Sequence, residues 1–369
     1  MKVLHVITGL DAGGAETQLA ALLRHTGHES DVVTLYNPGP VAEQIRSSGT
    51  SVRDIGMRSN RDLRALPRLR SLIAAGRYDV VHAHLYRSQV YARPAARLAR
   101  TPVVVTTEHS IGETHIERRR MTTGVRGLYL ASELFSDWTI AVSDVVRDRL
   151  IRWGVPERKI SVIPNGIDTA ALAFDPAARA RARAQFGIAP ETFVIGTLGR
   201  LDANKRVGMV IEAVAPLLGE RCVLLVVGRG GEMDALKVVA GKAGVADRVI
   251  FAGFQADTVA MLSAFDVYVM ASAQETFGLA ALEAMANGLP VIYTTCPALD
   301  AVPTAQARQV EGTAAALRAA FGDAVKAGFR PREPDDAVFD KYGIDGTARQ
   351  VDDLYQRLRQ DRLKLRDPA

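Results

Sequence analysis

Residues Ser161–Asp168, with the sequence SVIPNGID, separate two similar halves of the chain. A β-branched run ends at Ile163, and the Pro-Asn-Gly sequence at 164–166 favours a turn. On both sides of this turn, short apolar runs alternate with amphipathic stretches. That alternation predicts right-handed βαβ units and parallel sheets. We therefore expect an α/β protein with two doubly wound domains and a boundary near residues 165–175.

Each half supplies its own set of strands and helices. The strands predicted before the turn are Val3–Thr8, Asp31–Leu35, Val80–His82, Val103–Thr107 and Thr139–Val142, and the helices are Glu16–His25, Leu63–Ala75 and Val90–Ala99. The strands predicted after it are Phe193–Leu198, Val223–Val227, Val249–Phe251, Val267–Met270 and Pro290–Tyr293. The helices of that half are Pro176–Gln185, Val207–Leu218, Glu232–Ala243, Asp257–Ser263 and Leu279–Asn287.

The predicted domains are residues 1–168 and 169–344. A last helix, at about 345–362, is expected to pack back on the first domain. Two such Rossmann-like domains facing each other would form a cleft. Ligands of open α/β sheets bind beyond the carboxyl ends of the strands, so functional residues should lie in the loops that follow strands.

Composition limits the class of protein. The 369 residues exceed one ordinary domain, and 48% hydrophobic with 24% charged residues is typical of a globular chain, which argues against wholesale disorder. Two cysteines, Cys222 and Cys296, make no disulfide framework. The N-terminus resembles a strand more than a signal peptide, and no apolar run approaches ~18 residues. We expect a cytoplasmic protein, either free or at the inner face of the membrane.

The positive charge is unevenly distributed. Residues 1–170 hold 23 basic and 17 acidic side chains, whereas the remainder is nearly balanced, and the whole chain carries only +5. This mild excess is not typical of a nucleic-acid binder. Two explanations stay open: attraction to an anionic acceptor or membrane surface, and biased usage, since 38 of the 46 basic residues are Arg. The arginines of the first half concentrate at Arg53, Arg58, Arg61, Arg64, Arg68, Arg70 and Arg77, and again at Arg118–Arg120.

Three glycine-rich or basic loops follow predicted strands. Gly13 and Gly14 open a helix and would admit an anion to its free N–H groups. In the loop 199–206, Arg200 and Lys205 are either a solvated pair or a two-point phosphate clamp. The loop 228–231 contains Gly228 and Gly230, but the third glycine of a dinucleotide motif would fall on Met233, which disfavours an NAD dehydrogenase.

The strongest signal is the sequence QETFGLAALE at 274–283. Glu275 lies in a predicted loop, and Glu283 lies in the helix that follows, among apolar neighbours. A carboxylate in such surroundings needs a partner, and sugar hydroxyls could supply one. Backbone amides at Phe277, Gly278 and Leu279 would open the helix toward a phosphate or a hydroxyl.

At this point the chain resembles the retaining GT-B glycosyltransferases of family 4, over nearly its whole length. The markers occur in the expected order: Gly13-Gly14, VVHAHL at 80–85, TEHS at 107–110, VSD at 142–144, PNGID at 164–168, GRLDANK at 199–205, VVGRG at 226–230, AGF at 252–254 and the E-x7-E sequence at 275–283. One stretch departs from the family pattern. Residues 293–303, YTTCPALDAVP, lack the usual glycines, which questions contacts in the second domain but not the E-x7-E site.

The resemblance implies a role for each matching residue. Arg200 and Lys205 would bind the donor diphosphate, Glu275 and the amides of Phe277–Leu279 the sugar, and Glu283 the ribose. Gly13 and Gly14 would pack on the diphosphate and sugar, and Gly228, Gly230 and Phe254 would hold the base. His109 would contact a sugar hydroxyl near the reacting carbon. The resemblance thus assigns catalysis to Arg200, Lys205, His109 and Glu275.

The acceptor side is less defined. His84, Glu108, Glu113 and Arg118 are candidates, and we interpret Ile111–Gly127 as a mobile loop. No plausible D-x-D motif follows a strand, so we expect a metal-independent enzyme without a cofactor. The predicted reaction moves a hexose or N-acetylhexosamine, with retention, from a nucleotide sugar (UDP being our expectation) to a hydroxyl of an anionic or lipid-linked acceptor. The alternative is a nucleotide-sugar-binding or epimerase-like protein without transferase activity.

Overall fold

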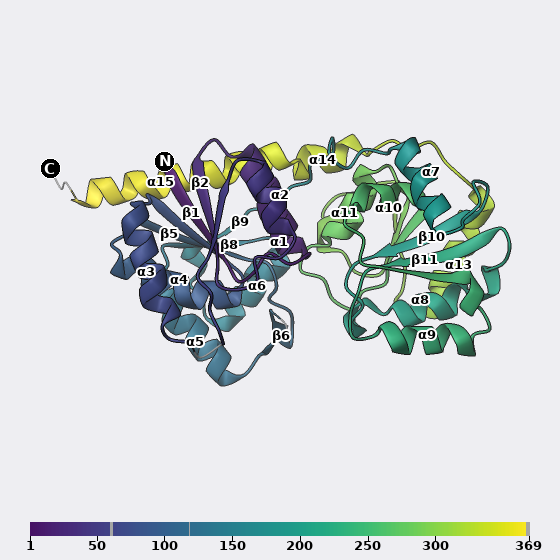
Figure 1. The fold of residues 1–369 in the computed structure, drawn as a ribbon, viewed down its shortest axis with the longest axis horizontal. Helices are drawn as coiled ribbons and strands as arrows, with labels where there is room; N and C mark the ends of the chain where they lie inside the picture. The colour runs from purple at the N-terminus through teal and green to yellow at the C-terminus, as the bar shows by residue number, and fades with distance from the viewer. Residues whose placement is uncertain (60–61, 118, 367–369) are drawn as a thin grey trace. The chain divides into compact units, whose positions relative to one another are not determined.

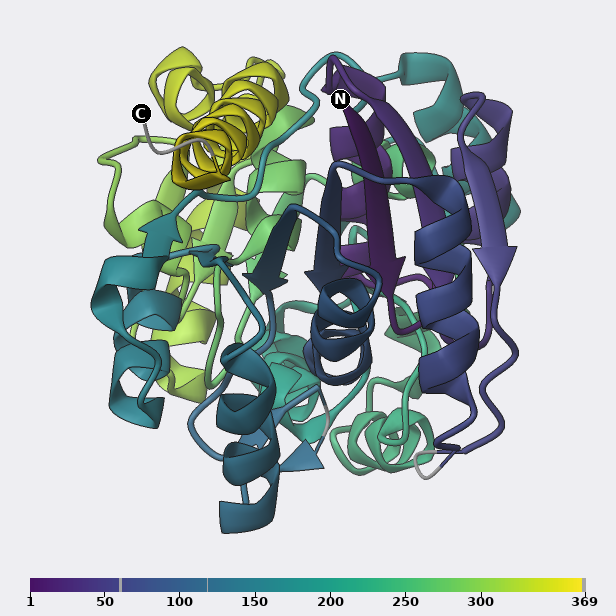
Figure 2. The ribbon, with the colours of Figure 1, turned by 90° about the vertical axis from the view of Figure 1, so that its left-hand side faces the viewer.

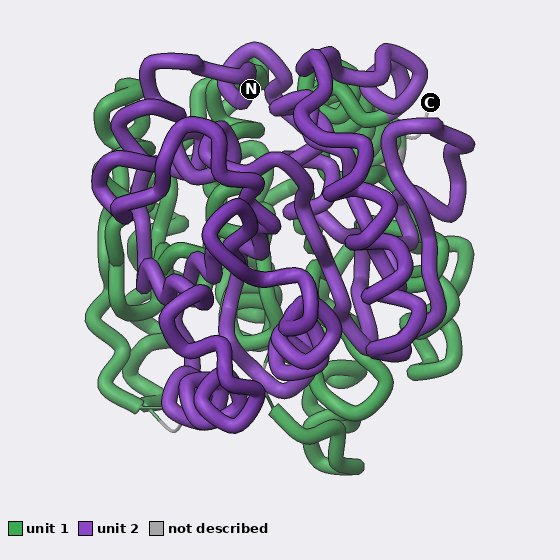
Figure 3. Tube along the Cα trace, turned by 90° about the vertical axis from the view of Figure 1, so that its right-hand side faces the viewer, with its two compact units in different colours: residues 1–166, 342–369 green, residues 167–341 purple. Residues whose placement is uncertain are grey.

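The computed structural model describes residues 1–59, 62–117 and 119–366. The chain divides into two compact units, shown in different colours in Figure 3. Unit 1 contains Met1–Gly166 together with Tyr342–Ala369, and unit 2 contains Ile167–Lys341. The division falls inside the PNGID sequence, where Pro164 and Gly166 interrupt regular structure.

A parallel sheet of seven strands forms the centre of unit 1, in the order β3-β2-β1-β4-β5-β8-β9. Figure 1 shows this sheet with helices around it. Its strands are β1 (Lys2–Ile7), β2 (Glu29–Thr34), β3 (Ser51–Asp54), β4 (Val80–His84), β5 (Val103–Glu108), β8 (Trp138–Ala141) and β9 (Ile160–Val162). The central strands β4 and β5 are buried along their whole length. Burial on both faces explains their nearly continuous β-branched runs.

Helices cover both faces of this sheet. They are α1 (Gly14–His25), α2 (Val41–Ser47), α3 (Ala65–Gly76), α4 (Tyr86–Leu98), α5 (Thr123–Glu133), α6 (Asp144–Trp153) and α15 (Ile344–Arg366). On one face, α3 and α4 pack on Leu4, Val6 and Val81. On the other face, α15 (yellow in Figure 2) packs on Val3, Val80 and Val103. The apolar residues of α15 recur at helical spacing, Ala348, Val351, Leu354, Tyr355 and Leu358, which explains why this helix docks on a sheet formed more than two hundred residues earlier.

Unit 2 contains a second parallel sheet, in the order β12-β11-β10-β13-β14-β15. Its strands are β10 (Phe193–Leu198), β11 (Cys222–Val227), β12 (Val249–Gly253), β13 (Val267–Met270), β14 (Val291–Tyr293) and β15 (Ala307–Gln309). Its helices are α7 (Pro176–Gln185), α8 (Val207–Val214), α9 (Met233–Lys242), α10 (Thr258–Ala264), α11 (Leu279–Ala286), α12 (Pro297–Asp300) and α13 (Ala314–Ala327), and α14 (Asp336–Tyr342) leads into α15. The strand order places β10 beside β13, although β11 and β12 lie between them in sequence.

The predicted α/β class with two Rossmann-like doubly wound sheets is confirmed. Several elements escaped prediction, among them α2, β3, α5, α6, α12, α13 and β15. No described helix has the length and apolarity that crossing a bilayer requires.

The interpretation of Ile111–Gly127 as one loop was wrong. This segment contains β6 (His115–Ile116) and β7 (Arg119–Arg120), which pair as an antiparallel hairpin, and then the start of α5. Thr122 caps α5, since its side chain accepts a hydrogen bond from Val125 N. Two-residue strands give no detectable period in sequence, so only the pairing reveals them. Arg118, a predicted acceptor residue, lies outside the described residues.

Candidate active site

Lys205 and Glu275, seventy residues apart in sequence, form an ion pair in unit 2. Lys205 Nζ lies 2.6 Å from Glu275 Oε1, and the two side chains are 24% and 13% exposed. Lys205 ends the 3-10 turn Ala203–Lys205 after β10, and Glu275 lies in the loop after β13. Because parallel strands end at the same sheet edge, the adjacency of β10 and β13 brings the two loops together.

Asn204 fastens these loops to each other. Its side-chain Nδ2 donates to Gln274 O at 2.9 Å, and its Oδ1 accepts from Gln274 N at 3.1 Å. Its backbone carbonyl also accepts from Ala273 N at 2.8 Å. Sequence reasoning missed this residue, because an Asn in a polar loop gives no signal for a partner seventy positions away. Asn204 therefore sets the position of Glu275 relative to Lys205.

Arg200 lies on the same loop as Lys205 but is more exposed. Its guanidinium Nη2 is 3.3 Å from Asp202 Oδ2, and the Arg200 side chain is 47% exposed. A small hollow between the loops is lined by residues of 197–207 and 268–272, among them Arg200, Lys205 and Tyr268. Two cations thus line one small hollow, Arg200 beside Asp202 and Lys205 beside Glu275.

Gly228 and Gly230 allow two neighbouring loops of unit 2 to pack closely. A Cβ at Gly228 would lie 1.8 Å from Gly199 O, and one at Gly230 would lie 2.0 Å from Leu201 O. The two loops are joined in addition by Leu201 N donating to Arg229 O at 3.0 Å. These glycines therefore let the loop after β11 pack directly on the loop that bears Arg200. Nearby, the exposed Phe254 ring lies 5.1 Å from the guanidinium of Arg229.

Gly278 shapes the start of α11. Its φ of 104° lies in the left-handed region, and a Cβ there would meet Cys296 Sγ at 2.3 Å. Phe277 is buried, and its carbonyl accepts from Ala298 N at 3.0 Å. The unusual 293–303 segment, which forms α12, thus braces the loop of the E-x7-E motif. Leu279 begins the helix, whose first N–H groups have no intrahelical partner.

Glu283 lies one turn inside α11, between buried neighbours. Its side chain is half-buried, and burial raises the pKa of its carboxyl group to about 7. Among the described residues, no side chain pairs with it. A carboxyl group poised between its two protonation states near neutral pH can hydrogen-bond a hydroxyl in either state.

In unit 1, Gly13 and Gly14 lie where sequence placed them. Gly13 is the N-cap of α1 in extended conformation, and Gly14 is its first residue. The N–H of Gly13 donates to Asp11 O at 2.9 Å, so the turn between β1 and α1 is tight. The first turn of α1 presents backbone N–H groups beyond the carboxyl end of β1, as an anion site requires.

His109 follows β5, is half-buried, and has its pKa lowered to about 4 by burial. Its Nε2 lies 3.3 Å from His84 Nδ1. The placement of His84 corrects our expectation of an acceptor contact, because this side chain is only 2% exposed and lies behind His109.

Glu108 needs the same correction. It is fully buried, and its carboxylate accepts from Ser110 N at 2.9 Å and from Gln89 Nε2 at 3.4 Å. Burial raises its pKa to about 7. Glu108 therefore braces the loop of His109 and does not face an acceptor. Glu113, by contrast, is exposed, with Arg149 Nη2 3.8 Å from its Oε1.

The comparisons with known proteins identify the family of the chain. Residues 12–171 match the family described as Glycosyltransferase Family 4, and residues 178–307 match Glycosyl transferases group 1. The D-inositol 3-phosphate glycosyltransferase of Actinosynnema mirum is 30% identical over 322 residues, which cover 76% of each chain. The chain belongs to the family 4/group 1 glycosyltransferases.

One further relative and one solved structure are similar to this glycosyltransferase. The UDP-Gal:alpha-D-GlcNAc-diphosphoundecaprenol alpha-1,3-galactosyltransferase of Escherichia coli is 30% identical over 242 residues, covering 63% of this chain and 62% of the relative. The crystal structure of Anabaena HepE in complex with UDP and glucose superposes with a TM-score of 0.84 at 22% identity, over 96% of this chain and 99% of that one. The latter likeness shows that the glycosyltransferase has the GT-B type of fold.

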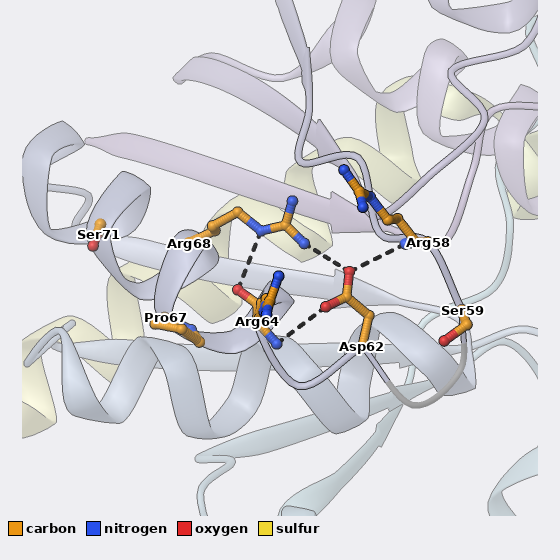
Figure 4. A pocket seen from close by; sticks show the side chains of 7 residues that line it. All are labelled: Arg58, Ser59, Asp62, Arg64, Pro67, Arg68 and Ser71. Carbon is orange, nitrogen blue, oxygen red and sulfur yellow. Dashed lines mark hydrogen bonds and ion pairs between the residues drawn. The ribbon is translucent and has the colours of Figure 1, made fainter.

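The glycosyltransferase also has a basic hollow of about 770 Å³ at the start of α3 (Figure 4). Arg58, Arg64 and Arg68 line it around Asp62, and Arg61 lies outside the described residues. The Asp62 carboxylate accepts from Arg58 N, Arg64 N and Arg68 Nη2, at 3.2, 3.2 and 2.8 Å. The hydrogen bond from Arg58 N is the largest of the effects that lower the pKa of the Asp62 carboxyl group below its usual range. The bonds from Arg68 and from Arg64 N act in the same direction. One carboxylate among three guanidinium groups leaves the hollow positive.

Proposed function

We propose that this glycosyltransferase transfers a hexosyl or N-acetylhexosaminyl group from a UDP-sugar to an acceptor hydroxyl, with retention and without a metal ion. The pairing of Lys205 with Glu275, beside Arg200, carries the proposal. It puts a cation for phosphate and a carboxylate for sugar hydroxyls within one hydrogen-bonded assembly. The UDP and glucose of HepE and the UDP-Gal in the name of the E. coli relative support the choice of donor.

The donor diphosphate would bind between Lys205 and Arg200. Lys205 has three N–H donors, so it can keep the Glu275 contact while it binds a phosphate oxygen. Arg200 would exchange its exposed partner Asp202 for phosphate. As the bond from the anomeric carbon to the diphosphate breaks, negative charge grows on the phosphate, and each preorganised cation stabilises it by ~3 kcal/mol.

The other contacts of the nucleotide sugar follow from the same loops. Glu275 and the amides at the start of α11 would hold sugar hydroxyls, and Glu283 would hold the ribose. Phe254, exposed beside Arg229, would contact the base. In unit 1, the turn at Gly13 and Gly14 would meet the diphosphate, and His109 would bind a sugar hydroxyl.

Retention fits the absence of a dedicated base among the described groups of this site. Glu108 is buried and directed at Ser110, and Glu275 is paired with Lys205. The acceptor oxygen would bond to the anomeric carbon on the face that the diphosphate leaves. The acceptor proton would pass to the departing phosphate oxygen, so that bonds and charges balance without another reactant. The charge of that phosphate would be met by Lys205 and Arg200, which is the basis for metal independence.

The acceptor would bind unit 1 and would carry a phosphate. Unit 1 holds the excess positive charge and the basic hollow of Arg58, Arg64 and Arg68. The relatives' names contain D-inositol 3-phosphate and a diphosphoundecaprenol. Both a soluble phosphate and a lipid-linked diphosphate match this chemistry. Contact with the inner face of the membrane and a cytoplasmic location belong to the same proposal.

A donor and acceptor screen tests the proposal. UDP-glucose, UDP-galactose and UDP-N-acetylglucosamine would each be incubated with inositol phosphate, a sugar diphosphate lipid or neutral octyl glucoside, with and without EDTA. We expect UDP release that requires a phosphorylated acceptor and survives EDTA, and an α-linked product by NMR. UDP binding with no transfer to any acceptor, or epimerised sugar as the product, would favour the non-transferase alternative. Loss of activity in EDTA would refute metal independence.

A further inference from the structure

Four of the seven histidines lie side by side in unit 1. His5 is on β1, His82 and His84 are on β4, and His109 follows β5. In the parallel register, His5 lies opposite His82, and His84 lies opposite Thr107, two residues before His109. Side chains two residues apart share a face of a strand, so all four histidines belong to the face that α15 covers.

Three of these rings form one hydrogen-bonded row. His5 Nδ1 lies 3.1 Å from His84 Nε2, and His84 Nδ1 lies 3.3 Å from His109 Nε2. Burial lowers the pKa of His5 to about 3 and that of His109 to about 4, and it lowers the pKa of His84 well below its ordinary value. At neutral pH each ring is therefore neutral and carries a single N–H.

Neutrality couples the tautomers of the three rings. Both nitrogens of His84 are in the row, so one donates and the other accepts. If His84 Nδ1 donates to His109, then His84 Nε2 accepts from His5 Nδ1, and all three protons lie on Nδ1. If His109 Nε2 donates to His84, the same logic places all three protons on Nε2. Mixed arrangements would set two lone pairs or two N–H groups against each other.

His82 belongs to a separate network. Its Nδ1 is 2.5 Å from the Tyr355 hydroxyl of α15, and its Nε2 is 2.7 Å from Thr107 Oγ1. The nitrogens of His5, His82 and His84 are close enough that a metal ion is a conceivable occupant. However, both nitrogens of His82 already make short hydrogen bonds, and His5 and His84 share another. The contacts favour a hydrogen-bonded cluster over a metal site.

We propose that His84 and His5 are positioning residues for His109, which fix its ring and select whether its Nδ1 donates or accepts a hydrogen bond. This inference rests on the proposed function only in that His109 serves the donor sugar. His109 Nδ1 is itself buried in this structure, so its hydrogen-bonding sense would act on a sugar hydroxyl only when the donor displaces the atoms that cover it. The tautomer of His109 is therefore linked, through His84, to that of His5 on β1, two strands away.

Nitrogen NMR of the full chain with 15N-labelled histidine tests the coupling directly. At pH 7 the ring 15N shifts distinguish Nδ1–H from Nε2–H tautomers, and single His→Gln changes assign the peaks. We expect His5, His84 and His109 to share one tautomer and none of them to be protonated. Two different tautomers within the row, or a charged ring, would overturn the proposal whether or not the chain transfers sugar.

A matched pair of variants tests the consequence for the site. His84→Phe keeps an aromatic ring and removes both hydrogen bonds of the row. His82→Phe is the control: His82 is as deeply buried as His84, and the two hydrogen bonds that it loses go to Tyr355 and Thr107, not to His109. We expect His84→Phe to return His109 to a tautomer mixture and to lower kcat at least fivefold, and His82→Phe to change neither. Unaltered His109 shifts in folded His84→Phe would refute the proposal. If His84→Phe does not fold, the tautomers of the native chain still decide. If the tautomers shift but no donor is used, the proposed function fails while the coupling stands.

Discussion

Lowering the pH from 7 to 5.5 should destabilise unit 1 steeply, because its buried histidines are neutral in the fold. The ordinary pKa of His is 6.5, and burial lowers it to about 3 for His5, to about 4 for His109 and well below 6.5 for His82 and His84. Between the unfolded and folded values, the unfolded chain binds protons that the folded chain does not. The free energy of unfolding therefore rises with pH in this window, and the contribution is lost as the pH falls.

The magnitude follows from proton counting. Each imidazole contributes up to ~1.4 kcal/mol per pH unit, so the four together contribute ~5 kcal/mol per pH unit near pH 5.5. Glu108 acts in the opposite sense, since its folded pKa is raised to about 7 and its contribution is lost as the pH rises. Glu108 reduces the pH dependence of the free energy of unfolding by ~1 kcal/mol per pH unit, which leaves a slope of ~4 kcal/mol per pH unit. Summed from pH 7 to pH 5.5, where the slope grows from small to its full value, the net loss is ~3 kcal/mol. A typical domain has only ~5–15 kcal/mol of stability in total, so unit 1 should lose a large share of its stability over this range.

Urea unfolding followed by tryptophan fluorescence measures this slope. Both tryptophans of the chain, Trp138 and Trp153, belong to unit 1, so the signal reports on that unit. Urea unfolding curves recorded at intervals from pH 5 to 7.5 give the free energy of unfolding at each pH. In the variant His82→Phe the slope should fall by ~1.2 kcal/mol per pH unit, because one titrating imidazole is gone. A flat profile between pH 5 and 6.5, or an unchanged slope in the variant, would show that these histidines are protonated in the fold.

Three substitutions in unit 2 test the donor site. Lys205→Ala should lower kcat/KM at least tenfold, or ~1.4 kcal/mol of transition-state stabilisation, whereas the exposed Lys237→Ala should change it less than twofold in the same assay of UDP release. Asn204→Ala removes two hydrogen bonds between the loops, so it should cost ~1–3 kcal/mol of stability and lower kcat/KM severalfold. Unchanged kcat/KM would show that Asn204 does not position the site. Gly228→Ala should lower the urea midpoint, followed by circular dichroism because both tryptophans lie in unit 1, by the equivalent of ~2 kcal/mol or more, since a Cβ would clash with Gly199 O. Gly231→Ala, with open space around it, should stay within ~1 kcal/mol.

Sequence patterns were sufficient for the architecture of the two halves. β1, β10 and β13 could be located within a residue or two, because a buried strand of a parallel sheet is a short β-branched run between turns. The hairpin β6–β7 could not, because four residues carry no period. Thr122 was likewise not predicted as a cap, and its hydrogen bond from Val125 N identifies it.

For the candidate site, too, the sequence indicated which residues lie in loops but not which of them meet. Chain position gave Lys205 and Glu275 as loop residues, but their contact depends on β10 lying beside β13, which strand order decides. Asn204 stands within the GRLDANK marker, but nothing in the sequence indicated its partner, which is seventy residues away. Glu108 was predicted as a loop carboxylate on the acceptor side, whereas it is fully buried and accepts a hydrogen bond from Ser110 N.

The sequence by itself determined that this chain has two parallel α/β halves, a turn between them and polar residues after the strands. These properties depend on local backbone preference and on hydrophobic period, both of which act over a few residues. Only the tertiary structure decided which of those residues meet. It brought Lys205 to Glu275, joined His5 to His109 through His84, and placed Tyr355 of the last helix on His82. Such contacts depend on strand order and burial, which no single segment of the chain encodes.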